Sequence, residues 1–258
     1  MTFTTRTPRI VAARRLQKRK DRDQGGRFLA EGPQAVREAL AAGVVVELFG
    51  TEAALVRHGD LALQAPVASA VTEDALEALT ETVQPQGLVA VCEQVDVTLS
   101  EALAKGPRLV AVAAEIRDPG NAGTVLRTAD AAGAGAVIFA GTAVDPYNGK
   151  CVRASAGSLF HVDVVRTGLD VVGELRAAGL QVLATSGYGA DDLDTLLDDG
   201  VLAGPTAWLF GSEAHGLPRE LLDAADRQVR VPIYGGAESL NLAAAAAVCL
   251  YASARAHR

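Results

Sequence analysis

The sequence predicts an α/β protein with a parallel sheet covered by helices on both faces, preceded by a small αβ domain. From residue 108 onward, short apolar runs alternate with helical patterns. These runs are apolar throughout, which is typical of strands that are buried on both faces. Apolar residues make up 49% of the 258 residues, which is enough for a sizeable core.

The N-terminal part begins with a basic pattern that predicts a helix from Val11 to Lys20, ending before the Gly25-Gly26 pair. Val36 and Leu40, four residues apart, indicate a later helix. The elements expected after the basic helix are strands at 28–32, 44–49 and 87–92 and helices at 34–42 and 72–79. We therefore expect a basic segment at 1–27 and a compact αβ domain at 28–96.

The C-terminal part, 108–258, reads as a second domain. The expected strands are 109–114, 136–141, 161–165, 181–185, 207–210 and 228–232, and the expected helices are 122–132, 148–156, 168–178, 217–224 and 239–255. Ligands of open parallel sheets bind beyond the carboxyl ends of the strands. The loops 115–121, 211–216 and 232–240 are therefore the places to look for a site.

The net charge of −7 is distributed unevenly. Residues 1–27 carry nine basic side chains against Asp21 and Asp23, a balance of +7, so the rest of the chain carries −14. A basic arm on an acidic body suggests a polyanionic partner held by the arm. Charge alone equally allows a solvated helix that only keeps the protein soluble.

Several classes of site are not indicated. Cys92, Cys151 and Cys249 are far apart and form no Cys-x-x-Cys pair, and the four histidines show no ligand spacing, so we expect reduced, mostly buried thiols and no metal site. The most apolar window, 240–254, is too short to span a membrane, and the N-terminus lacks the apolar core of a signal peptide. We therefore expect a cytoplasmic protein with no membrane partner.

The first loop leads from a strand through a Pro-Gly turn into a helix that we expect to open near Asn121. Asn is a favourable N-cap, and the amide groups at a helix start can bind an anion. Arg127 follows six residues later, within reach of a group held at the helix start. The turn alone is better explained as an ordinary capped turn with a surface arginine.

In the second loop, 209–217, two apolar residues are followed by Gly211. We expect this glycine to let a ligand lie close to the backbone. Glu213 in this loop can hold an amine, a hydroxyl or an arginine. The glycine spacing does not match a dinucleotide-binding fingerprint, which argues against a nucleotide-dependent oxidoreductase.

The third loop is rich in glycine and leads into an Ala-rich helix. Ser239 is the expected N-cap of that helix. Asn241 stands in the expected first turn, where Asn is unfavourable away from a cap, so it suits hydrogen bonding to a ligand. A capped core helix would explain the same residues without a ligand.

Together, the order Asn-x5-Arg, Gly-x-Glu-x-x-Gly and Pro-x6-Ser-Leu-Asn resembles the three motifs of the SpoU/TrmH family of RNA 2′-O-ribose methyltransferases. Residues 108–256 resemble its catalytic domain. The sequence 28–32 with 84–87 resembles the RNA substrate-binding domain that many members carry in front. The resemblance implies a trefoil knot near the C-terminus, a homodimer, an RNA partner and S-adenosylmethionine as the cofactor.

The resemblance also assigns roles to residues. The backbone of Gly211, Val231 and Leu240 matches the positions that hold the cofactor, and Ile233 is expected to line the adenine pocket. The residues that match the polar catalytic set are Asn121, Arg127, Glu213, Ser239 and Asn241. The sulfonium of the cofactor is already strongly electrophilic, so we expect no metal.

Arg127 is expected to carry the chemistry. A role as general base has been proposed for this arginine in the family, but a guanidinium with a pKa above ~12 stays charged. We therefore expect Arg127 to bind a substrate phosphate and stabilise the developing alkoxide. Glu213 and Asn121 are expected to position it, and Ser239 and Asn241 to orient the hydroxyl or the cofactor loop.

Family analogy favours ribosomal RNA as the substrate. Two alternatives stay open: a tRNA methyltransferase on the same scaffold and a non-catalytic RNA-binding protein. The Asn121–Arg127 pair argues against methylation of a base, and the intact motif set argues against a decayed site.

Overall fold

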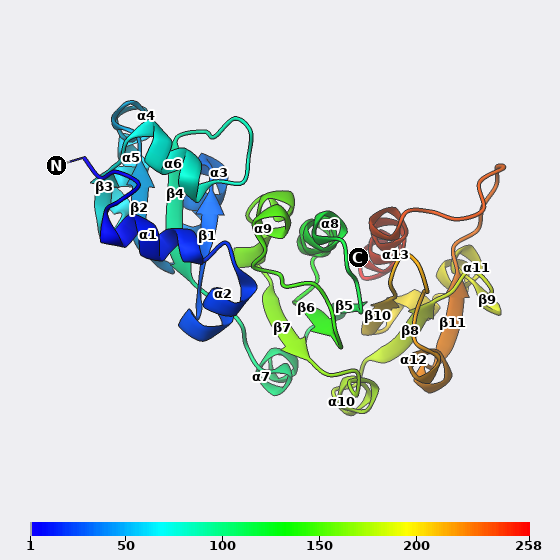
Figure 1. Ribbon diagram of the computed structural model, residues 1–258. Helices are drawn as coiled ribbons and strands as arrows, with labels where there is room; N and C mark the ends of the chain where they lie inside the picture. Colours follow the sequence, from blue (N-terminus) through cyan, green and yellow to red (C-terminus); the bar gives the residue numbers. More distant parts are fainter. Residues whose placement is uncertain (1) are drawn as a thin grey trace. The chain divides into compact units, whose positions relative to one another are not determined.

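The computed structural model describes residues 2–258, which form two compact units (Figure 1). The first unit contains the residues up to Val95 together with the later segment Asp145–His161. The second unit contains Asp96–Val144 and Val162–Arg258. Each unit has its own sheet.

The first unit is built on a four-stranded sheet in the order β1-β4-β2-β3, in which β4 is antiparallel to both of its neighbours. Its strands are β1 (Arg27–Glu31), β2 (Val45–Gly50), β3 (Ala68–Ala70) and β4 (Leu88–Glu93). Its helices are α1 (Pro8–Arg15), α2 (Arg19–Gly25), α3 (Pro33–Ala41), α4 (Glu52–Arg57), α5 (Gly59–Gln64), α6 (Glu73–Leu79) and α9 (Gly149–Ser155), with a 3₁₀ turn at Ser158–Phe160.

The basic N-terminal segment is part of this unit and not a separate arm. Ile10 and Ala13 of α1 are buried in one apolar cluster with Leu76 and Leu79 of α6. The single helix expected from Val11 to Lys20 is wrong, because α1 ends at Arg15 and α2 begins only at Arg19. Lys18 between them has an extended backbone, with φ −95° and ψ 131°.

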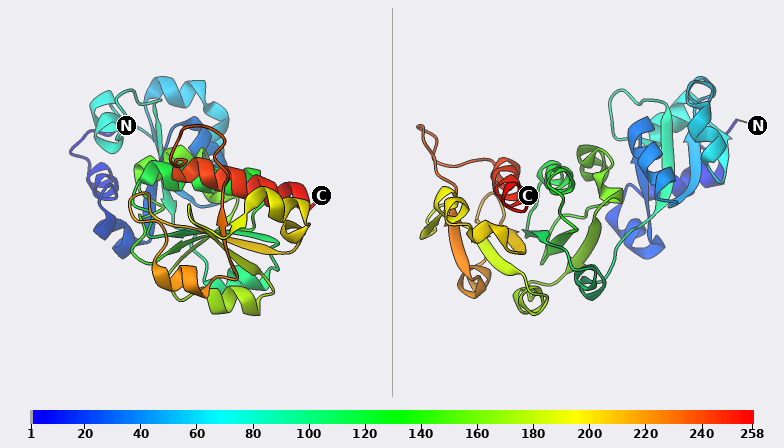
Figure 2. Two further views of the ribbon diagram at one scale, coloured as in Figure 1. Left: turned by 90° about the vertical axis from the view of Figure 1, so that its right-hand side faces the viewer. Right: turned by 180° about the vertical axis from the view of Figure 1, so that it is seen from behind.

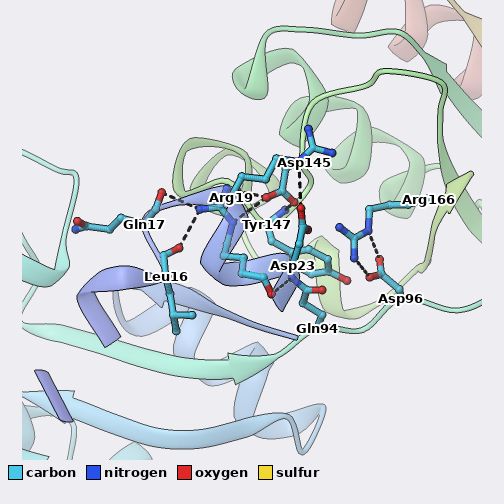
Figure 3. A network of polar contacts seen from close by, with 10 residues as sticks. Leu16, Gln17, Arg19, Asp23, Gln94, Asp96, Asp145, Tyr147 and Arg166 are labelled. Atoms are coloured by element: carbon cyan, nitrogen blue, oxygen red, sulfur yellow. Dashed lines mark hydrogen bonds and ion pairs between the residues drawn. The ribbon is translucent and has the colours of Figure 1, made fainter. Parts of the chain in front are cut away.

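A buried ion pair accounts for this break. Arg22 donates to the backbone carbonyls of Leu16 and Gln17, both at 2.9 Å, just after α1 ends. Its Nε and Nη2 atoms each lie 2.7 Å from Oδ2 of Asp145 (Figure 3). The other oxygen of Asp145 accepts a hydrogen bond from the backbone N–H of Tyr147 at 2.9 Å. Only 4% and 3% of the two side chains are exposed, and hydrogen bonds satisfy both charges.

The segment Asp145–His161 lies in the sequence between two strands of the second unit. Its place in the sequence led us to expect it in the domain 108–258, but its contacts lie in the first unit. The centroid of the Tyr147 ring lies 4.7 Å from that of the Phe28 ring. The Tyr147 hydroxyl accepts a 2.9 Å hydrogen bond from the backbone N–H of Val95. Arg153 of α9 pairs with Glu31 of β1 at 3.0 Å.

The second unit confirms the predicted parallel sheet, in the order β7-β6-β5-β10-β8-β11-β9 with every neighbouring pair parallel. Its strands are β5 (Leu109–Ala114), β6 (Ala136–Ala140), β7 (Asp163–Thr167), β8 (Gln181–Thr185), β9 (Asp191–Asp192), β10 (Thr206–Phe210) and β11 (Arg227–Arg230). Its helices are α7 (Leu99–Ala104), α8 (Pro119–Ala131), α10 (Val172–Ala177), α11 (Leu193–Asp198), α12 (Arg219–Ala224) and α13 (Leu242–Ala256), with a 3₁₀ turn at Val201–Ala203.

Helices cover both faces of this sheet. α8 and α13 lie side by side over one face, and α7, α10 and α12 lie on the other (Figures 1 and 2). Trp208 of the central strand β10 is fully buried and donates a 2.9 Å hydrogen bond from its indole nitrogen to the hydroxyl of Ser253. This bond fixes α13 to the middle of the sheet.

Four short helices were not expected from the sequence: α4 and α5 in the first unit, and α7 and α11 in the second. α7 lies where only a connection was expected, although Thr98 and Glu101 form a capping box at its start. α11 has six residues, too few for a clear helical period. The three cysteines are free and buried, as expected, and burial raises the pKa of the Cys92 and Cys249 thiols. Within residues 2–258, no helix has the length and apolar character needed to cross a membrane.

We predict that removing one partner of the buried ion pair strongly destabilises the first unit. Arg22→Met leaves Asp145 charged, buried and unpaired, and should lower the free energy of unfolding by about 3–5 kcal/mol. Arg19→Met is the control, because the pair that Arg19 forms with Asp23 is exposed and its loss should cost under ~1 kcal/mol. Chemical denaturation measures both. Equal, small losses for the two variants would contradict the prediction.

Candidate active site

A cavity of about 440 Å³ lies at the carboxyl ends of β8, β10 and β11 in the second unit. Its walls come from the three loops that follow these strands and from the first turn of α13. The lining residues are Thr185, Ser186, Gly187, Gly211, Ser212, Glu213, Gly216, Val229, Val231, Ile233, Glu238, Ser239, Leu240, Asn241, Leu242 and Ala245. The site therefore lies where the topology of a parallel sheet predicts it.

The loop after β10 closes on itself. The backbones of Ser212 and Gly216 exchange two hydrogen bonds, at 3.0 and 2.9 Å. A Cβ atom on residue 211 would lie 2.1 Å from the carbonyl carbon of Gly216 and 2.2 Å from the nitrogen of Leu217. The reason expected for Gly211, room for a ligand, is therefore incomplete, because the loop's own backbone already excludes a side chain there.

Three of the expected polar residues form a hydrogen-bonded chain across the mouths of three loops. Asn121 of α8 donates from Nδ2 to Oε1 of Glu213 at 2.7 Å. Asn241 donates from Nδ2 to Oδ1 of Asn121 at 3.3 Å. Asn121 thus links the loop after β10 to the start of α13.

The helix caps differ from those expected. α8 is capped by Asp118, whose carboxylate accepts from the backbone N–H of Asn121 at 2.8 Å. Asn121 therefore lies in the first turn, where its side chain is free to reach the other two loops. α13 is capped by Asn241, whose Oδ1 accepts from the N–H of Ala243 at 2.9 Å, and not by Ser239. Asn241 is favourable at that position because it is the cap.

Arg127 is placed differently from the other expected residues. It is exposed on α8 and does not line the cavity. Its guanidinium forms no hydrogen bond or ion pair with any residue in the range 2–258, so neither Glu213 nor Asn121 holds it here. Those two side chains bind each other instead.

The residues expected to hold the cofactor all line the cavity. They are Gly211, Val231, Ile233 and Leu240, joined there by Glu213, Ser239 and Asn241. Thr185, at the end of β8, and Ser186 and Gly187, which follow it, also line the cavity and were not predicted from the sequence. The signal was present, because a polar Thr-Ser-Gly sequence directly follows the apolar residues of a strand that ends at the same edge.

The chemistry of this lining fits an adenosine-type ligand. Apolar side chains alternate with glycine and strand-end backbone, which together offer an apolar slot and backbone hydrogen-bond groups. Across residues 2–258, the structure contains no cluster of three or more His, Cys, Asp or Glu side chains that could hold a metal ion.

Comparison with protein families gives two matches. Residues 108–251 match the SpoU rRNA Methylase family, and residues 7–90 match the MRM3-like substrate binding domain. One relative, the 23S rRNA (guanosine(2553)-2′-O)-methyltransferase RlmP of Bacillus subtilis, is 37% identical over 241 residues, which cover 92% of each chain.

Two solved structures resemble nearly the whole chain. The AdoMet-bound rRNA methyltransferase from Sinorhizobium meliloti has a TM-score of 0.85 and 33% identity, covering 99% of this chain and 97% of that one. The SpoU methyltransferase AviRb from Streptomyces viridochromogenes, in complex with AdoMet, has a TM-score of 0.81 and 30% identity, covering 96% and 98%. With a family match over more than half of its length and relatives along nearly all of it, this chain belongs to the SpoU rRNA methylase family.

Proposed function

We propose that the protein transfers a methyl group from S-adenosylmethionine to a ribose 2′-hydroxyl of 23S ribosomal RNA. The observation that carries this proposal is the cavity at the strand ends, whose mouth is bridged by Asn121, Glu213 and Asn241. The names of the relatives favour ribosomal RNA over tRNA.

Residues around the cavity suit S-adenosylmethionine. We infer that the backbone of Gly211, Val231 and Leu240 and the side chain of Ile233 hold its adenosine part. The cofactor supplies an electrophilic methyl group on its sulfonium. The protein's task is then to orient the ribose and to stabilise the charge that develops on its oxygen.

The polar residues divide this task. The Glu213–Asn121–Asn241 chain holds three loops in register, so we assign these side chains to positioning. Ser239 lines the cavity with an exposed side chain and is proposed to orient the ribose hydroxyl. Arg127, exposed and without a protein partner among residues 2–258, is proposed to bind the adjacent phosphate and stabilise the alkoxide.

The first unit is proposed to hold the RNA. Arg9, Arg15, Arg19 and Arg22 are paired with carboxylates within it. The basic side chains on its N-terminal helices and flanks that are exposed, and that form no ion pair with the described residues 2–258, are Arg6, Arg14, Lys18, Lys20 and Arg27. These are available for phosphate contacts, so the charge of this segment still supports RNA binding although it is not a free arm.

We further propose a cytoplasmic homodimer whose second unit contains a trefoil knot. Exposed Val248 and Tyr251 lie on α13, beside a groove shared with α8 and α11, and a second copy would cover them. The knot is supported by the return of α13, after β11, across β10 to α8 and β5. Because Arg127 does not line its own chain's cavity, we propose that it serves the partner's cavity.

Filling the cavity should block the cofactor. Ala245 of α13 lines the cavity, so Ala245→Leu should weaken binding of S-adenosylmethionine at least ~10-fold by occupying its space. Ala177→Leu is the control, because Ala177 is exposed on α10 and lies outside the cavity. Calorimetric titration with the cofactor measures both. Unchanged affinity in Ala245→Leu would show that the cofactor binds elsewhere.

Removing the guanidinium of Arg127 should slow the chemical step. Arg127→Ala should lower single-turnover methylation of 23S rRNA by ~10²-fold or more, because a donor to the developing charge is lost. Arg127→Lys should recover little, since an ammonium cannot make a bidentate phosphate contact. Cofactor affinity and melting temperature should stay unchanged. Arg219→Ala, an exposed arginine of α12, is the matched control. A fully active Arg127→Ala enzyme would refute this role.

Mixing two impaired variants, at a cofactor concentration too low to fill the cavity of the Ala245→Leu chain, tests whether the site is completed by the partner. A heterodimer of Arg127→Ala and Ala245→Leu chains has one intact site, made of the first chain's cavity and the second chain's Arg127. Random exchange of subunits should therefore restore about a quarter of the unaltered activity, because half of the dimers are mixed and each has one working site. If each site is built within one chain, mixing restores no activity. A stable monomer in light scattering would likewise contradict a site completed by the partner.

A further inference from the structure

A second cavity, of about 290 Å³, lies entirely within the first unit. The two sequence motifs at 28–32 and 84–87, which the methyl-transfer site does not use, meet there. The residues that line it are Glu31, Gly32, Gln34, Ala35, Thr80, Thr82, Gln84, Pro85, Gln86, Leu88, Arg153 and Ala156. They come from the end of β1 and the start of α3, from the loop between α6 and β4 with the first residue of β4, and from the C-terminal end of α9.

Glu31 joins two of the segments that line this cavity. Its Oε1 accepts from Nη1 of Arg153 at 3.0 Å and from the backbone N–H of Glu81 at 3.0 Å. Only 7% of the Glu31 side chain is exposed, and burial raises its pKa. One buried carboxylate thus fixes both α9 and the start of the loop before β4.

Two glycines let the motifs approach each other. Gly32 has a φ of +86°, and a Cβ atom there would lie 2.8 Å from Oε1 of Gln86, so the Gln86 side chain lies against bare backbone. Gly87 also has a φ of +86°, and its Cβ would lie 2.5 Å from that of Ala54. Both conformations are strained for any residue with a side chain.

The lining combines free amides with an apolar floor. Gln84 and Gln86 are exposed, and their side chains form no hydrogen bond to any part of the chain between residues 2 and 258. Ala35 and Leu88 are buried at the floor, next to Pro85. A primary amide offers a donor pair and an acceptor side by side, which matches the edge of a nucleobase, while an apolar floor suits its face.

We propose that this cavity binds one unpaired nucleotide of the RNA substrate, at a point separate from the methylated ribose. The inference rests on the proposed function, which supplies the RNA. Single-stranded bases are the usual targets of sequence-specific RNA recognition, through their edges and faces. The volume suits a single base, and the cavity belongs to the unit that matches a substrate-binding domain and carries the exposed basic side chains.

The test uses the full-length enzyme and 23S rRNA extracted from a strain that lacks the gene. Gln84→Ala, Gln86→Ala and the double variant are compared with Gln64→Ala, an exposed glutamine of α5 outside the cavity. The double variant should raise KM for the RNA about tenfold, because two hydrogen bonds to a base are lost. The turnover number and the affinity for S-adenosylmethionine should change less than about twofold. The melting temperature should not change.

Ultraviolet crosslinking gives a second readout that does not depend on turnover. The unaltered enzyme should crosslink a single RNA position to a peptide that contains Gln84 and Gln86, and the double variant should lose that crosslink. An unchanged KM together with an unchanged crosslink would overturn the inference while leaving the proposed function intact. Failure of the unaltered enzyme to methylate the RNA would instead overturn the proposed function, and this inference with it.

Discussion

The hydrogen bonds of one asparagine hold the proposed active site together. The backbone N–H of Asn121 completes the cap on α8, its amide nitrogen holds Glu213, and its amide oxygen accepts from Asn241. Loops that follow β5, β10 and β11 are thereby tied at one edge of the sheet. No other side-chain type of this length has a donor and an acceptor on one planar group, which is why an aspartate or a leucine could not replace it.

The fold was largely predictable because its signal is local. Fully apolar runs such as 109–114 and 136–140 can be read as strands buried on both faces, and the carboxyl-edge rule then places the loops that matter. The cavity residues Gly211, Val231, Ile233 and Leu240 were placed by resemblance to a family, and their positions follow from the same topology. Their roles stay predictions.

Other features depend on contacts that sequence does not show. Asp118 and Asn121, three residues apart, are equally favourable N-cap residues. Asp118 is the cap because its backbone is extended and the helix begins directly after it. Arg22 looks like one of nine basic surface residues, yet its partner lies more than a hundred residues away at Asp145. The distant partner converts a presumed arm into part of a core, and no periodicity within 1–27 carries that information.

The same ion pair has a consequence for biosynthesis. Because Asp145 and Tyr147 complete the first unit, this N-terminal unit cannot reach its final packing when its own first 95 residues leave the ribosome. It must wait until the chain has been made through His161, several seconds later at ~5–20 residues per second. By then β5 and β6 of the second unit have also been made. The first unit therefore completes its packing only after synthesis of the second unit has begun, and a chain cut after Val95 would leave Arg22 without its carboxylate.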